Sequence, residues 1–154
     1  MGRKASVTIR KAWEDKYRVP TAADLLAALA GPHGELLRTA REALGQFATE
    51  RIAWLGIPWR WSLVYSTPKG VRPLTYLVPQ PGRPLMVLPL GGEVALDVLE
   101  RKLSRPVRDA ILHAPVVGEV RWTQWELTSK AQVEELLRLA RAVREGNSLA
   151  MQSA

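Results

Sequence analysis

The stretch that decides the fold reads Trp54-Leu-Gly-Ile-Pro-Trp59-Arg-Trp61-Ser-Leu-Val-Tyr65. Apolar and polar side chains alternate from Trp59 to Ser66, and this period of two is typical of a β-strand with one buried face. The alternation predicts a strand over residues 59–66. It also predicts that the aromatic rings of this segment point to one side of the strand and Arg60 to the other.

Three further segments around this stretch are also strand-like. They are residues 51–55, 74–78 and 85–90, and the connections between them are short and rich in Gly and Pro. Short connections of this kind favour antiparallel pairing of neighbouring strands. The last of these segments is apolar at both alternating sets of positions, which predicts a central or covered strand.

Helical spacing of apolar residues predicts two helices before this region, two after it, and one near the end of the chain. Thr21 is expected to cap a helix in which Asp24 suits the positive end of the helix dipole. Ser129 with Gln132 has the spacing of a capping box, and Ser104 is also expected to cap a helix. The helices are expected over about residues 21–29, 33–49, 93–103, the segment after Ser104, and 130–145, with a last strand over 117–127.

This order of elements predicts an α+β protein with a single, mainly antiparallel sheet of about five strands and helices packed on one face. The single domain is expected to span residues 20–146. Residues 1–19 are expected to form a flexible basic arm, which Trp13 and Tyr17 can anchor, and residues 147–154 a frayed tail. If helices cover one face, the other is free to bind a ligand or a second copy of the chain in a homodimer.

The composition limits the possible chemistry. The chain has 154 residues and no Cys, which excludes disulfides, thiolate catalysis and zinc–thiolate sites. It has no apolar run long enough to span a bilayer and no apolar leader at its start, so we expect a cytoplasmic protein without a membrane partner. The net charge of +7 favours anionic partners.

The basic charge is concentrated in two places. Residues 1–20 hold six basic and two acidic side chains, and residues 51–92 hold five basic side chains and no acid. The second segment also contains Trp and Tyr rings, which can stack on planar groups while Arg contacts anions. Core packing is the alternative for Trp61 and Tyr65. The sequence therefore predicts a ligand-binding surface made by Trp59, Arg60, Trp61, Arg72 and Tyr76.

Other kinds of site have little support in the sequence. The chain has two histidines, His33 and His113, both next to helix borders, and it has no G-x-S-x-G motif. We therefore predict no catalytic residue, no metal site and no cofactor.

The favoured hypothesis is a non-enzymatic binding domain for a small organic or anionic ligand. Two alternatives remain open. One is an enzyme of unrecognised type in which Arg60 or Tyr76 orients an anionic substrate. The other is a nucleic-acid-associated protein that adds phosphate contacts from its arm, through Arg3, Lys4, Arg10 and Lys11.

Three segments of the chain resemble the bacterial family known as domain of unknown function 3788. They are Trp54–Tyr65, Leu74-Thr-Tyr76-Leu-Val-Pro79, and Leu85-Met-Val-Leu-Pro-Leu-Gly91. The family has a run of the form W-x-x-G…GWSL-x-Y, a strand of the form L-x-Y-L-x-P, and a strand that ends in Gly before a helix. The resemblance covers roughly residues 19–145. One departure is Arg60, because the family commonly has Gly before the Trp that corresponds to Trp61.

The resemblance implies an intracellular α+β protein of bacterial type, without an established activity. The chain is more distantly similar to small YdhG-like and YjbR-like domains, some of which are discussed as iron-delivery or DNA-binding proteins. That second similarity is an analogy at the level of the fold, so it predicts no site residue here.

Overall fold

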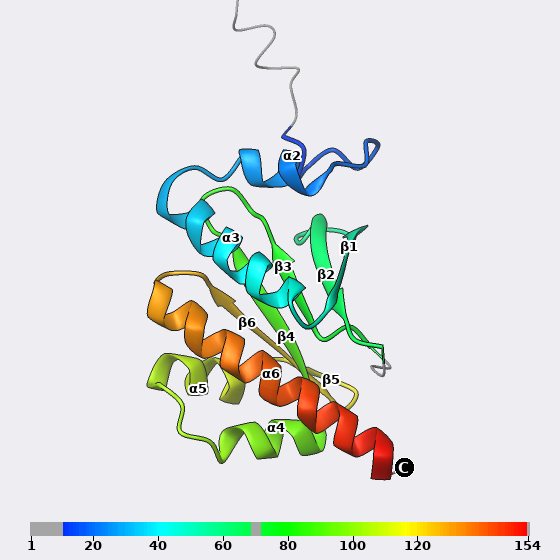
Figure 1. Ribbon diagram of the computed structural model, residues 1–154, viewed down its shortest axis with the longest axis vertical. Helices are drawn as coiled ribbons and strands as arrows, with labels where there is room; N and C mark the ends of the chain where they lie inside the picture. Colours follow the sequence, from blue (N-terminus) through cyan, green and yellow to red (C-terminus); the bar gives the residue numbers. More distant parts are fainter. Residues whose placement is uncertain (1–10, 69–71, 154) are drawn as a thin grey trace, which may run out of the picture.

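The computed structural model describes residues 11–68 and 72–153, with side chains through Gly146. It confirms an α+β fold with one antiparallel, open sheet, in which the strands follow the order β1-β2-β3-β4-β6-β5 (Figure 1). The strands are β1 (Thr49–Trp54), β2 (Trp61–Ser66), β3 (Thr75–Val78), β4 (Leu85–Gly91), β5 (Val116–Val117) and β6 (Val120–Glu126). The helices are α2 (Ala22–Ala27), α3 (Gly31–Gly45), α4 (Gly92–Leu99), α5 (Arg105–Leu112) and α6 (Lys130–Ser153).

One face of the sheet carries the main hydrophobic core, and we call it the core face. Residues that pair directly across antiparallel strands point to the same side. One such row on the core face runs from strand to strand through Ile52, Leu63, Leu77, Met86 and Trp125. Four of these side chains are buried, and α3 and α6 cross this side of the sheet in Figure 1.

The opposite side of the sheet, which we call the open face, has its own row of paired residues. This row runs through Arg51, Val64, Tyr76, Val87 and Gln124. Its two ends are exposed and its middle is buried. Because α3 and α6 pack on the core face (Figure 1), other groups must cover the middle of this row.

β4 is the central strand that the apolar pattern of residues 85–90 predicts. It lies between β3 and β6, and every residue from Leu85 to Leu90 is buried. Two core-face hydroxyls bind to its backbone, because Thr75 donates a hydrogen bond to the Val87 carbonyl and Thr123 donates to the Leu88 carbonyl. These bonds satisfy polar groups that are buried in the core.

The expected strand over residues 59–66 is wrong at its start. β2 begins at Trp61, and Trp59 lies in the turn of residues 55–60, which folds back over the open face. Within this turn the Arg60 N–H donates to the Gly56 carbonyl at 2.6 Å, and the Leu55 N–H donates to the Arg60 carbonyl at 2.9 Å. Trp59 therefore leaves the alternation and does not share a side with Trp61.

Other differences concern the ends of elements. Gly31, expected to end the first helix, instead begins α3, and the last helix continues through Ser153 rather than ending near 145. The sheet has a sixth strand, β5, which pairs with β6 across a two-residue turn. The left-handed backbone of Gly118, with φ of 63°, suits the first position of that turn.

Two of the three predicted helix caps are confirmed. Thr21 and Asp24 form a reciprocal capping box, and the Gln132 N–H donates to the Ser129 hydroxyl at 3.1 Å. Ser104 precedes α5 but does not cap it with its side chain. Its hydroxyl and its backbone N–H both donate to the Glu135 carboxylate, each at 2.7 Å, so this serine ties α5 to α6 instead.

Candidate functional site: an aromatic cluster on the open face

Three aromatic rings meet on the open face, and we call them the ring cluster. The ring centroids of Trp59 and Tyr76 are 5.8 Å apart, and each of these rings lies 6.1 Å from the ring of Trp122. The planes are tilted by 41° to 53°, a favourable arrangement for aromatic groups at this separation. Tyr76 is buried, whereas both Trp side chains stay partly exposed.

The sheet register brings Tyr76 and Trp122 together. Tyr76 lies on β3 and Trp122 on β6, so the backbone of β4 runs between them. Trp122 stands opposite Pro89, and Tyr76 stands opposite Val87, two residues earlier on the same strand. The two rings therefore reach toward each other across the open side of β4.

Trp59 arrives from the opposite direction and is held by its backbone. The indole Nε1–H of Trp13 donates to the Trp59 carbonyl at 3.0 Å, and the Ser62 hydroxyl donates to the same oxygen at 3.2 Å. Arg60, the next residue, has a left-handed φ of 55°, which lets the chain re-enter β2 just after Trp59. Together these features fix the third ring over the sheet.

A hollow of about 310 Å³ adjoins the ring cluster, and we call it the aromatic hollow. This volume is at the lower end of the range for small-molecule sites. The His113 Nδ1 lies 2.9 Å from the Asp109 carbonyl and donates to it in the corresponding tautomer, which leaves Nε2 as an acceptor. The lining residues are Trp59, Ala110, His113, Ala114, Pro115, Trp122 and Gln124.

The charges of two arginines act on the Tyr76 phenol. Arg51 belongs to the same cross-strand row, and Arg72 precedes β3. Burial raises the pKa of the Tyr76 phenol, while the charges of Arg51 and Arg72 lower it, and the net pKa is above the ordinary value. The Tyr76 phenol is therefore protonated at neutral pH and can donate a hydrogen bond.

The structure brings some of the predicted site residues together and separates others. The rings of Trp59 and Tyr76 are in contact, and the charge of Arg72 acts on the Tyr76 phenol. Trp61 is buried on the core face, where its ring packs against Trp54 at 5.6 Å and its Nε1–H donates to the Asp15 carbonyl at 2.7 Å. The ring of Trp61 therefore lies outside the ring cluster.

Arg60 also points elsewhere. Its guanidinium lies 5.1 Å from the ring centroid of Trp13, a cation–π contact. Of the two aromatic residues expected to anchor the arm, Trp13 is buried and Tyr17 is 85% exposed. Lys11 is exposed, and Arg3, Lys4 and Arg10 lie outside the described residues. Arg60 thus contributes to holding residues 11–20 against the turn.

Sequence reasoning missed Trp122, Gln124 and His113 as site residues. The alternation of β6 carries a signal for the first two, because residues two apart on a strand share a face. It does not say which strand is the neighbour. The contact with Tyr76 requires the pairing of β4 with β6, whose partners Val87 and Gln124 are separated by both α4 and α5.

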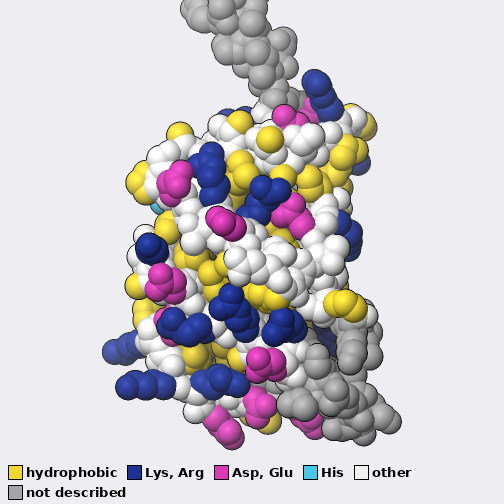
Figure 2. Space-filling view, in the orientation of Figure 1, with side chains coloured by type: hydrophobic (Ala, Val, Ile, Leu, Met, Phe, Trp, Pro, Cys, Tyr) yellow, Lys and Arg dark blue, Asp and Glu magenta, His cyan; other side chains and the backbone are white. Residues whose placement is uncertain are grey.

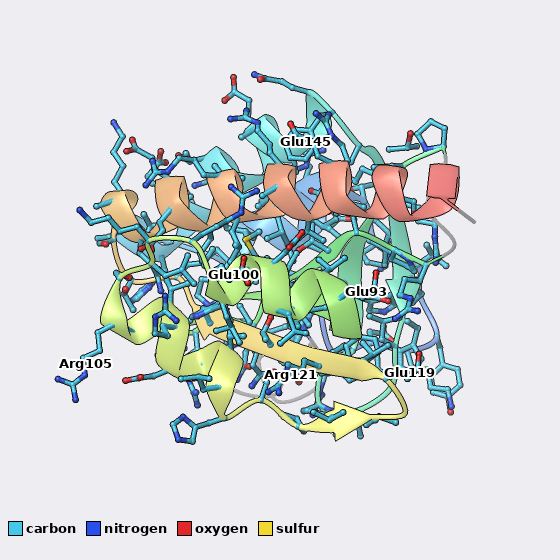
Figure 3. All side chains as sticks on the ribbon, turned by 90° about the horizontal axis from the view of Figure 1, so that it is seen from below. Glu93, Glu100, Arg105, Glu119, Arg121 and Glu145 are labelled. Atoms are coloured by element: carbon cyan, nitrogen blue, oxygen red, sulfur yellow. The ribbon has the colours of Figure 1, made fainter. Side chains whose placement is uncertain are left out.

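The charged groups around α4 and β6 give weaker support for a functional site than the ring cluster does. Figure 3 shows Glu93 and Glu100 at opposite ends of α4, with Glu119 near the turn between β5 and β6. Arg121 on β6 donates to the Ile111 carbonyl of α5 at 3.2 Å. Within residues 11–68 and 72–153, no group of three or more His, Asp or Glu side chains is placed to hold a metal ion.

Comparisons with protein-family models, with curated proteins and with solved structures find no match to this chain. In the part of the chain that the structure describes, no helix is both long and apolar enough to cross a membrane. Function is therefore inferred from the ring cluster and the groups around it.

Proposed function

We propose that this protein is a binding domain that holds a small planar organic ligand in the aromatic hollow, against the exposed parts of Trp59 and Trp122. The observation that carries the proposal is the ring cluster itself, because it lies on the sheet face opposite α3 and α6 (Figure 1) and borders a hollow of about 310 Å³. Planar ligands bind well to such rings, since stacking on an aromatic side chain contributes roughly 1–3 kcal/mol per ring.

The lining of the hollow supports this choice of ligand. Ala110, Ala114 and Pro115 add apolar wall, while Gln124 and His113 supply the few polar groups that fix orientation in small-molecule sites. No carboxylate lines the hollow. A neutral or anionic ring is therefore accommodated more easily than a cationic one.

Membership of the family with domain of unknown function 3788 remains a proposal as well. It is supported by the backbone of Arg60, whose φ of 55° lies in the region that favours glycine. The family commonly has a glycine at this position. A shared turn geometry would explain how this chain keeps the same fold with an arginine there.

Thermal unfolding in the presence of planar probes tests the proposed function. Suitable probes are indole, nicotinamide and adenosine, each added in increasing concentration to the full chain. A ligand at a hundred times its Kd adds about 2.7 kcal/mol to the stability, which corresponds to a rise in Tm of roughly 5–10 °C for a chain of this size.

The matched variants are Trp122→Leu and Trp54→Leu. Trp122 lines the hollow, whereas Trp54 packs against Trp61 away from it. We expect Trp122→Leu to abolish the rise in Tm and Trp54→Leu to preserve it. If no probe raises the Tm of the unaltered chain, or if Trp122→Leu responds as the unaltered chain does, the proposed function is wrong.

A further inference from the structure

The open face carries two chemically different ends on either side of Tyr76. Arg51 and Gln124 occupy the same row as Tyr76, each two strands away from it in opposite directions. Neighbouring strands lie about 4.8 Å apart, so the Cα atoms of Arg51 and Gln124 are each about 10 Å from that of Tyr76. The ring of Tyr76 therefore separates an arginine end from an amide end.

The arginine end is positively charged, and no acid among the described residues pairs with it. Arg51 and Arg72 are exposed, and neither forms an ion pair within the described ranges 11–68 and 72–153. No Asp or Glu occurs anywhere from residue 51 to residue 92. Glu126 of β6 is paired with Arg83. Arg51 lies in the cross-strand row of Tyr76, and the charge of Arg72 also lowers the pKa of the Tyr76 phenol. Two such cations without an acidic partner in the described residues attract an anionic group.

The amide end, by contrast, is neutral. Gln124 offers a donor and an acceptor side by side, and His113 offers Nε2 as an acceptor when its Nδ1–H donates to Asp109. A side-chain amide can pair with the adjacent donor and acceptor on the edge of a nucleobase, as Gln pairs with adenine. This end therefore suits a heteroaromatic ring with polar atoms on its edge.

We propose that the site binds an elongated ligand in which a heteroaromatic ring fills the aromatic hollow and an anionic group reaches past Tyr76 to Arg51 and Arg72. This proposal rests on the proposed function and names its ligand class. A ring with a directly attached carboxylate is too short to engage both ends. A nucleoside phosphate has the required parts in the required order, whether it is a free nucleotide or a residue of a single strand.

The test compares adenosine with adenosine diphosphate by isothermal titration at low ionic strength. The two probes share the ring, so their difference reports the anionic group alone. We expect adenosine diphosphate to bind at least tenfold more tightly than adenosine. In the double variant Arg51→Gln/Arg72→Gln, we expect that advantage to disappear while adenosine binds as before. The control is Arg83→Gln, which removes an arginine already paired with Glu126.

The outcomes separate this inference from the proposed function. If adenosine binds and adenosine diphosphate binds no more tightly, the proposed binding of an anionic group is wrong, and the proposed site for a planar ligand is still supported. If the double variant keeps the full advantage, Arg51 and Arg72 are not the anionic end. If neither compound binds while indole does, nucleotide chemistry is wrong and the hollow still takes rings.

A short oligodeoxyadenylate distinguishes the two sources of the same chemistry. Binding that exceeds that of adenosine diphosphate by more than tenfold, and that weakens in the double variant, assigns the site to single-stranded nucleic acid. If the oligodeoxyadenylate binds more weakly than adenosine diphosphate, the site is assigned to a free nucleotide. Oligodeoxyadenylate binding that is unchanged in the double variant would overturn the proposal for both sources.

Discussion

Arg60 is the residue on which the position of Trp59 depends. Its φ of 55° is the single left-handed conformation of a non-glycine residue in the described part of the chain. Such a conformation costs a residue with a side chain roughly 1–2 kcal/mol. The cation–π contact of Arg60 with Trp13 offsets part of this cost, by about 0.5–1 kcal/mol at a site near the surface.

A comparison of Arg60→Gly with Arg60→Ala separates these two effects. Both variants lose the contact with Trp13, but only glycine relieves the left-handed backbone. Allowing for the greater freedom of glycine in the unfolded chain, we expect Arg60→Gly to exceed Arg60→Ala in free energy of unfolding by up to about 1 kcal/mol. Urea denaturation measures this difference. A more stable alanine variant would mean that the backbone at this position is not strained.

Glu50 is the residue through which pH acts most directly on the core face. It accepts hydrogen bonds from the Tyr65 hydroxyl at 2.7 Å and from Arg41 Nε at 3.0 Å. Burial alone raises the pKa of Glu50, but the hydrogen bonds from Arg41 and Tyr65 outweigh it and the net pKa is lowered. The folded state therefore holds this carboxylate ionised at a pH where the unfolded chain begins to take up a proton.

We predict that Glu50→Gln destabilises the protein by about 1–3 kcal/mol at neutral pH, because it weakens hydrogen bonds to a charged group. A depressed folded pKa stabilises above the unfolded value of about 4.3, and this stabilisation is lost as the pH falls through the folded pKa. The gap between the two proteins should therefore shrink below about pH 4.3. Urea midpoints measured from pH 7 to pH 3 check this, and a gap that stays constant would contradict it.

At the scale of elements, residues 11–20 and the turn of residues 55–60 hold each other in place. The Trp13 Nε1–H donates to the Trp59 carbonyl, and the Trp61 Nε1–H donates to the Asp15 carbonyl. Residues 11–20 thus supply an indole donor to the turn and a backbone acceptor to Trp61, the first residue of β2 after the turn. The position of Trp59 in the ring cluster therefore depends on a segment more than forty residues earlier in the chain.

We predict that Trp13→Phe loosens the turn without unfolding the sheet. The change removes one hydrogen bond to the Trp59 carbonyl and should cost about 1–2 kcal/mol, including the smaller ring. Hydrogen exchange should become faster in residues 55–60 and stay unchanged in β4 and β6. Trp125→Phe is the control, since the buried Nε1 of Trp125 has no hydrogen-bond partner in the described residues. Equal effects of both changes on the turn would contradict the mutual anchoring.

The elements differ in how well the sequence predicts them. The alternation from Trp61 to Tyr65 is local, and it correctly predicts that these two rings share one side of the strand, where both are buried as the alternative of core packing has it. The predicted side of the Trp59 ring is wrong, because a turn that ends at Arg60 interrupts the period just before β2. The alternation alone does not reveal this turn. β5 is only two residues long, which is too short to show the apolar–polar alternation of a strand. The ring cluster depends on the pairing of β4 with β6, and non-local pairing leaves no mark in a single sequence.

At the scale of the molecule, the basic charge is spread over both sides of the sheet. Figure 2 shows Lys and Arg side chains gathered over α6 on the helical side, where Arg141 and Arg144 contact the ring of Phe47 at 5.2 and 5.0 Å. Arg51 lies on the open face in the row of Tyr76, and the charge of Arg72 acts on the Tyr76 phenol. Binding of any polyanion therefore has to be assigned to a surface before it is interpreted.

The salt dependence of oligodeoxyadenylate binding makes that assignment. Single-strand binding falls with a slope of about −0.7 per neutralised phosphate on logarithmic scales, so two arginines predict a slope of about −1.4. We expect the Arg51→Gln/Arg72→Gln variant to lose this slope and a chain without residues 1–10 to keep it. A much steeper slope that decreases on removal of residues 1–10 would instead assign the contact to Arg3, Lys4 and Arg10.

A second copy of the chain on the open face would compete with a ligand for the ring cluster. The homodimer therefore remains an alternative use of the same surface. Sedimentation at increasing protein concentration, with and without adenosine, distinguishes the two uses. We expect the mass to be independent of adenosine, and a dimer that adenosine dissociates would indicate that the rings serve assembly.

Nuclear magnetic resonance tests most directly whether a planar ligand binds in the aromatic hollow. The experiment follows the indole N–H signals of the six tryptophans during titration with adenosine, indole or nicotinamide. Single Trp→Phe variants assign each signal. The ring cluster predicts that the signals of Trp59 and Trp122 shift with a common Kd while those of Trp54 and Trp61 stay in place. The claim is contradicted if no probe at millimolar concentration moves the signals of Trp59 and Trp122, or if only the core-face tryptophans respond.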